Sequence, residues 1–149
     1  MTLEEAIKQK HFPDQIEKAV VNVLYTSGYI YSNHQQNLKA FGISPEQYNV
    51  LRILRGSHPK KLSLLEISGR MLDKSSNATR LVEKLRLKEM VTRKICKVDR
   101  RHVDIGITEN GLSILLKVDA ESKAWFQKLI HLESEEARTL NDLLDKMRG

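Results

Sequence analysis

A short segment near the middle of the chain combines small polar side chains with basic ones. Over residues 76 to 88, apolar residues recur at intervals of three and four, which predicts a helix with one buried face. The opposite face then carries amide, hydroxyl and basic groups, which can pair with base edges in the major groove of duplex DNA or with phosphates. The candidate contacts on this helix and on the turn before it are Lys74, Ser75, Ser76, Asn77, Thr79, Arg80 and Lys84. An ordinary solvated helix face is the alternative interpretation.

A second basic cluster lies at the tip of a predicted β-hairpin. The segments Val91 to Ile95 and Val103 to Ile107 alternate apolar or long residues with others, as paired strands do. They bracket the sequence Lys97-Val98-Asp99-Arg100-Arg101-His102. An arginine at a hairpin tip fits the narrow minor groove, where the potential of DNA is most negative. Arg100 and Arg101 are therefore candidate DNA contacts, and a simple charged turn is the alternative.

The positive charge of the chain is confined to the part that holds both clusters. The formal net charge is +6. Residues 60 to 102 contain 13 of the 25 Lys and Arg but only 5 of the 19 Asp and Glu, a local net charge of +8. A solvated basic surface does not require such segregation, whereas neutralisation of phosphates does. The charge pattern therefore favours double-stranded DNA as the partner.

The basic helix belongs to a predicted helix-turn-helix. Ser44-Pro45-Glu46-Gln47 and Ser63-Leu64-Leu65-Glu66 each place Gln or Glu three residues after a capping Ser, which predicts two helix starts. The second start opens a short helix to about residue 72, and a polar turn then leads into the basic helix. Two short helices joined by a turn of three or four residues are typical of a helix-turn-helix.

Long helices are predicted at both ends of the chain. Residues 14 to 41 and residues 109 to 132 each form an apolar stripe, and Ser134 is expected to cap a last helix. A helix of about 28 residues in so small a protein needs a partner surface beyond its own core. We therefore expect a mainly α, single unit that forms a homodimer. In it, residues 1–41 and 109–149 are dimerisation helices of the unit 1–149, and residues 44–107 form a winged helix-turn-helix lobe with a small β-hairpin wing.

The segment from Leu62 to Gly111 resembles the multiple-antibiotic-resistance regulator (MarR) family of transcription regulators. The most specific match is Asp99-Arg100-Arg101 followed by Ile107-Thr108-Glu109-Asn110-Gly111, because the family places Asp-x-Arg at the wing tip and Leu-Thr-x-x-Gly at the next helix start. The resemblance implies that Asp99 orients Arg101. It also implies a sequence-specific regulator, which we expect to be a ligand-responsive repressor on a near-palindromic operator.

One position departs from the family pattern. The family usually has Gly after the recognition helix, where Lys88-Glu89-Met90 stands in this chain. A left-handed conformation at Glu89 would cost on the order of 1 kcal/mol or more. The sequence therefore leaves the geometry of this turn open.

The resemblance also implies a place for a small ligand. Similar regulators bind anionic or phenolic compounds between the dimerisation helices and the DNA-binding lobe. Tyr hydroxyls and an Arg on the first two predicted helices could serve a small aromatic or anionic ligand. The candidates are Tyr25, Tyr29, Tyr48 and Arg52. An aromatic set at helical spacing is also typical of a core, and that alternative stays open.

The sequence offers no recognisable catalytic, metal or cofactor site. It has no Gly-rich phosphate loop and no nucleophile motif, and its five histidines lack the spacing of a zinc site. We therefore expect no enzyme. No apolar run approaches the roughly 18 residues that span a bilayer, and with a single Cys96 and no signal peptide we expect a cytoplasmic protein. The alternative function is a winged-helix module for protein–protein contacts without a DNA role.

Overall fold

The computed structural model describes residues 1–95 and 103–149, so the predicted wing tip lies outside the described residues. Within them the chain is mainly helical, with one antiparallel two-stranded hairpin, as the sequence predicts. The helices are α1 (Leu3–Ile7), α2 (Gln15–Lys39), α3 (Pro45–Ser57), α4 (Leu64–Arg70), α5 (Ala78–Leu87), α6 (Glu109–Leu129) and α7 (Ser134–Arg148), and the strands are β1 (Val91–Ile95) and β2 (Val103–Ile107).

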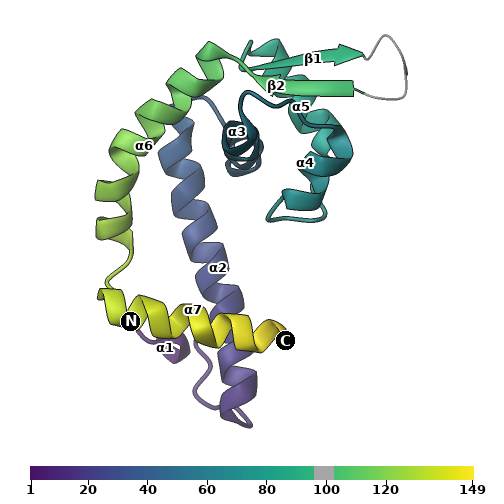
Figure 1. Cartoon of the computed structure of the whole chain (residues 1–149). Coiled ribbons are helices and arrows are strands. Elements are labelled where there is room, and N and C mark those ends of the chain that lie inside the picture. The colour runs from purple at the N-terminus through teal and green to yellow at the C-terminus, as the bar shows by residue number, and fades with distance from the viewer. Residues whose placement is uncertain (96–102) are drawn as a thin grey trace.

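Two long helices carry a lobe at one end (Figure 1). The lobe consists of α3, α4, α5 and the hairpin, with the C-terminal end of α2 and the N-terminal end of α6 packed against it. From there α2 and α6 run away from the lobe, and α7 lies near their far ends. The candidate DNA-binding segments are therefore gathered in the lobe, whereas the apolar stripes of the terminal helices extend beyond it.

Side-chain caps explain where the main helices begin. Asp14 starts α2, because its carboxylate accepts hydrogen bonds from the backbone N–H groups of Ile16 and Glu17 at 2.7 and 2.8 Å. The two predicted capping boxes are both present, at the starts of α3 and α4. The last cap differs from the prediction, since Ser134 is already helical. Glu133 precedes α7 instead, and its backbone N–H donates to the carboxylate of the helical residue Glu136 at 2.8 Å.

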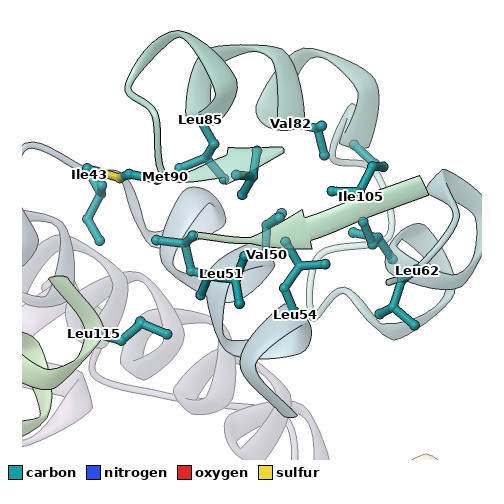
Figure 2. Close-up of a cluster of buried hydrophobic side chains, with 14 of the residues drawn as sticks. Ile43, Val50, Leu51, Leu54, Leu62, Val82, Leu85, Met90, Ile105 and Leu115 are labelled. Carbon is teal, nitrogen blue, oxygen red and sulfur yellow. The ribbon is translucent and has the colours of Figure 1, made fainter. Parts of the chain in front are cut away.

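The hydrophobic core lies between the lobe helices and the hairpin (Figure 2). Leu51 and Leu54 of α3, Leu85 of α5 and Ile105 of β2 are at most 1% exposed and point toward one another. Leu62, just before α4, exchanges two backbone hydrogen bonds with Ile105, at 2.8 and 2.9 Å. This pairing adds a third extended segment beside the base of the hairpin and thereby fixes the hairpin against the helix-turn-helix.

The turn after α5 is a Schellman motif with Glu89 in the left-handed conformation. Glu89 has φ 57°, its N–H donates to the Arg86 carbonyl at 2.9 Å, and the Met90 N–H donates to the Leu85 carbonyl at 3.0 Å. Leu85 and Met90 are both buried in the core, which supplies the apolar contact typical of this motif. The chain thus keeps the geometry that glycine would favour, although glutamate makes it costlier.

Candidate nucleic-acid interface

The turn between α4 and α5 is held by Asp73. Its carboxylate accepts the Ser75 backbone N–H at 2.9 Å, the Ser75 hydroxyl at 2.7 Å and the Ser76 hydroxyl at 2.9 Å. These hydrogen bonds, those from Ser75 above all, lower the pKa of Asp73. The Asn49 side chain of α3 accepts the Leu72 backbone N–H at 2.9 Å and ties the turn to the core. The start of α5 is therefore fixed before any partner binds.

Asn77 is the N-cap of α5. Its side-chain oxygen accepts the Arg80 backbone N–H at 3.0 Å, so the helix begins at Ala78, two residues later than the start expected from the sequence. An asparagine that reads adenine uses its amide oxygen as well as its NH₂ group. Because the Asn77 oxygen already serves the helix start, this side chain has a structural role in addition to the predicted contact.

The exposed face of α5 carries the remaining predicted contacts. Ala78, Val82 and Leu85 point into the core, whereas Thr79, Arg80 and Lys84 are exposed. On the preceding turn, Lys74 and Ser75 are exposed, Ser76 is half-buried, and the Lys74 ammonium donates to the Gly69 carbonyl at 2.6 Å. The predicted residues of the turn and helix thus share one surface of the lobe. The three predicted wing residues, Asp99, Arg100 and Arg101, lie outside the described residues.

Two arginines beside this surface are absent from the sequence prediction. The Arg86 guanidinium donates to both carboxylate oxygens of Glu83 at 2.7 to 3.2 Å. Arg93 of β1 approaches the same carboxylate with 3.9 Å between its Nη1 and Glu83 Oε2. Arg86 is the main cause of the lowered pKa of Glu83. The spacing of Glu83 and Arg86 signals their ion pair, but nothing in the sequence places Arg93 beside them.

The start of α6 is bonded to the turn that follows α5. Thr108 donates its backbone N–H to the Met90 carbonyl at 3.1 Å and its hydroxyl to the Glu89 carbonyl at 2.7 Å. The Asn110 side chain donates to the Lys88 carbonyl at 3.2 Å. Gly111 is buried here, and a Cβ at this position would lie 2.3 Å from the Met90 carbonyl oxygen. The Thr-x-x-Gly sequence therefore allows the long helix to dock tightly onto the end of α5.

An open cleft of about 720 Å³ lies between α2, α3 and α6. Tyr48 and Arg52, two of the four candidate ligand residues, line it, and the Arg52 guanidinium donates to the Tyr48 hydroxyl at 2.9 Å. Tyr25 and Tyr29 are not among the lining residues. The cleft is lined by His34, Tyr48, Arg52, Leu72, Asp119, Ser122, Trp125, Phe126 and Gln127.

Aromatic rings form one wall of the cleft. The His34 ring centroid lies 5.2 Å from that of Tyr48 and 5.3 Å from that of Trp125. Burial lowers the pKa of His34, which favours the neutral imidazole. At the edge of the cleft, Arg55 of α3 pairs with Asp119 of α6 at 2.5 Å and links the lobe to the long helix. The sequence did not identify His34 or Trp125 as cleft residues, because only the fold brings α2 and α6 together.

Other classes of site are not indicated. Across residues 1–95 and 103–149, no three His, Cys, Asp or Glu side chains are grouped as metal ligands. Within the same ranges, every helix is too short or too polar to cross a lipid bilayer.

Comparison with known proteins identifies the family. A sequence model of the MarR family matches residues 43–103. The chain is 31% identical over 103 residues to the HTH-type transcriptional regulator MhqR of Bacillus subtilis, covering 68% of each chain. Its fold matches a putative MarR-like transcription regulator from Bacillus cereus, with a TM-score of 0.78, 21% identity and coverage of 88% of this chain and 94% of the other.

A further structural match is a mutant MarR from E. coli solved in complex with operator DNA. The TM-score is 0.77, at 21% identity, and the match covers 93% of this chain and 99% of the other. With the helix-turn-helix, the hairpin and the flanking long helices all present, the protein belongs to the MarR family of DNA-binding helix-turn-helix transcriptional regulators.

Proposed function

We propose that this regulator is a ligand-responsive repressor that binds a near-palindromic operator as a homodimer. The observation that carries the proposal is the exposed polar and basic face of α5 within the most basic part of the chain. Asn77 caps the start of this helix, and Asp73 accepts hydrogen bonds within the turn before it. The fold is shared with a MarR protein that was solved on operator DNA. A dimer lying across an operator would exclude polymerase, which is the basis for proposing repression.

Unpartnered apolar surface supports the dimer. Only Leu38 is buried among the 25 residues of α2, and α7 buries none of its 15. Both helices nevertheless expose large apolar side chains, which a second copy would cover. They are Ile16, Val20, Val23, Leu24, Tyr25, Tyr29 and Tyr31 on α2, and Leu140, Leu143 and Met147 on α7. In this proposal residues 1–41 and 109–149 dimerise, and residues 44–107 bind DNA.

Each lobe then meets one half-site through two elements. The exposed face of α5 enters the major groove, with Thr79, Arg80 and Lys84 toward bases and phosphates. The wing reaches the adjacent minor groove with Arg100 and Arg101, and Asp99 orients Arg101. Lys74, Ser75, Ser76 and Asn77 lie at the start of α5, where the positive end of the helix dipole favours phosphate.

The two elements should respond differently to loss of one arginine. Arg80→Ala should relax base preference at one position per half-site, because a forked contact to guanine discriminates by roughly 1–3 kcal/mol. Arg101→Ala should weaken binding to all sites evenly and lower the salt slope by about two units per dimer. The measurement is affinity for a panel of operator variants at several salt concentrations.

Lys10→Ala is the matched control, because it removes the same charge from the N-terminal segment outside the lobe. It should leave both base preference and slope unchanged. Wild-type affinity and slope in Arg101→Ala would show that the wing does not touch DNA.

The cleft is the proposed ligand site. Its aromatic wall and Arg52 suit a small aromatic compound with an anionic or phenolic group.

Trp125, the sole tryptophan, lines the cleft, so its fluorescence should report on occupancy of the cleft. Aromatic acids and phenols that bind should change its fluorescence and weaken operator binding at the same concentrations, and Arg52→Met should weaken both effects for the acids. Release of the operator without any change in Trp125 emission would place the ligand elsewhere.

A further inference from the structure

Helix α5, the recognition helix of the proposed DNA-binding mode, carries one acidic residue. This residue lies on the side of α5 that faces the hairpin. Glu83 is the only Asp or Glu in α5, which also holds Arg80, Lys84 and Arg86. The turn after α5 reverses the chain, so that β1 lies alongside the helix. Arg93 of β1 thereby approaches the Glu83 carboxylate. The side chains of Glu83, Arg86 and Arg93 are 39%, 46% and 35% exposed. The cluster is therefore accessible and has a net charge of +1.

A carboxylate on a DNA-binding face requires a reason, because phosphates repel it. Glutamate can read cytosine by accepting a hydrogen bond from its amino group. The geometry argues against that role, since Arg86 donates to both oxygens of Glu83 in a forked arrangement and Arg93 faces one of them. Reading a base would require breaking charge-assisted hydrogen bonds that are already formed. Glu83 is arranged instead to hold arginines.

The position of the cluster indicates what those arginines meet. With α5 in the major groove and the hairpin in the neighbouring minor groove, one sugar–phosphate strand separates the two elements. That strand must cross the border between α5 and β1, where Arg86 and Arg93 lie. This placement rests on the proposed DNA-binding mode.

We propose that Glu83 is a positioning residue that holds Arg86 and Arg93 together for contact with the backbone phosphates between the two grooves. A free arginine side chain loses rotamer freedom when it binds, and a carboxylate that orders it beforehand reduces that cost. Arginines held in one position can contact phosphates only when α5 lies in the groove as it does on the operator. Mobile arginines can contact the phosphates of any duplex. Glu83 therefore raises the preference for operator over other DNA, although it removes one unit of positive charge.

The test compares an operator selected from random duplexes by the intact protein with a scrambled duplex of equal length. Affinities are measured by fluorescence anisotropy at several salt concentrations. Glu83→Gln should lower operator affinity roughly five- to tenfold and leave scrambled-duplex affinity unchanged or higher. Arg86→Gln should lower the operator salt slope by about two units per dimer, and Arg86→Lys should keep the slope but lose operator affinity.

Two comparisons make the result specific to positioning. Glu109→Gln removes the same charge from an exposed residue at the start of α6 and should raise affinity for both duplexes alike. Glu83→Gln added to a variant that carries both Arg86→Gln and Arg93→Gln should not weaken operator binding further, because Glu83 acts through these two arginines. The substituted side chains are exposed or, for Glu83, half-buried, so equal melting temperatures are expected and confirm that folding is intact.

The proposal fails if Glu83→Gln keeps the wild-type ratio of operator to scrambled affinity, or if it still lowers operator affinity in the variant that lacks both arginines. A changed preference at a single base position in Glu83→Gln would also overturn it, because Glu83 would then read a base. If the intact protein selects no sequence at all, the proposed operator binding itself is wrong.

Discussion

Gly111→Ala should lower the free energy of unfolding by about 3 kcal/mol. The added Cβ would lie 2.3 Å from the Met90 carbonyl oxygen and 2.8 Å from Ile107 Cγ1. Neither atom is the far end of a flexible side chain, and the Met90 oxygen already accepts the Thr108 N–H at 3.1 Å. Relief of the clash therefore has to separate α6 from the end of α5. Urea unfolding followed by circular dichroism, at fixed protein concentration, measures the loss.

Gly56→Ala is the matched control for this substitution. Gly56 lies near the end of α3, and apart from its chain neighbours and the helix's own backbone no atom lies within 4 Å of the Cβ that it would gain. Because alanine favours a helix over glycine by up to about 1 kcal/mol, this variant should be as stable as the wild type or slightly more stable. Equal unfolding midpoints for the two variants would contradict the tight docking of α6 onto the turn after α5.

Leu143→Glu should convert the proposed dimer largely to monomer and abolish operator binding at nanomolar concentration. Leu143 is 58% exposed on α7 and lies in one stripe with Leu140 and Met147. If a second copy covers this stripe, the glutamate places an unpaired charge in an apolar interface, which costs about 3 kcal/mol or more. Sedimentation equilibrium measures the dimer dissociation constant, which should rise about a hundredfold or more.

Asn141→Glu adds the same charge to the same helix outside that stripe and should leave the dimer intact. Deletion of residues 134–149 should give monomers or insoluble protein. A Leu143→Glu protein that sediments as the wild type and binds the operator normally would remove α7 from the interface.

Local patterns predicted most of the fold. The Ser-x-x-Gln and Ser-x-x-Glu capping boxes predicted two helix starts that the structure confirms, because a cap acts on backbone groups within three residues of itself. The alternation of Val91 to Ile95 and Val103 to Ile107 predicted the two strands, whose residues pair in register from Val91 with Ile107 to Ile95 with Val103. The segregated charge predicts that residues 60 to 102 bind DNA, and this stays a prediction.

Contacts between distant segments could not be predicted in the same way. The pairing of Leu62 with Ile105 and the approach of Arg93 to Glu83 depend on tertiary packing, which leaves no periodic signal in the sequence. The cleft illustrates the same limit, because helical spacing grouped Tyr25 and Tyr29 with Tyr48, whereas the fold places Trp125 of α6 there instead.

At Glu89, tertiary contacts outweigh the local preference of a non-glycine residue against the left-handed conformation. Its side chain disfavours the left-handed conformation, but burial of Leu85 and Met90 and the hydrogen bond from Thr108 hold the backbone there. Tertiary contacts of this kind are worth more than the roughly 1 kcal/mol penalty that the sequence alone suggests.

Dimeric, sequence-specific recognition of DNA is tested by selecting bound sequences from random duplex DNA with the purified protein. Two symmetric recognition helices must meet the same face of the duplex, so the selected sites should form an inverted repeat. The two half-site centres should lie about one helical turn apart, and affinity for these sites should fall steeply with salt. A single short asymmetric site, or no enriched sequence with salt-insensitive binding, would contradict the proposed dimeric, sequence-specific recognition of DNA.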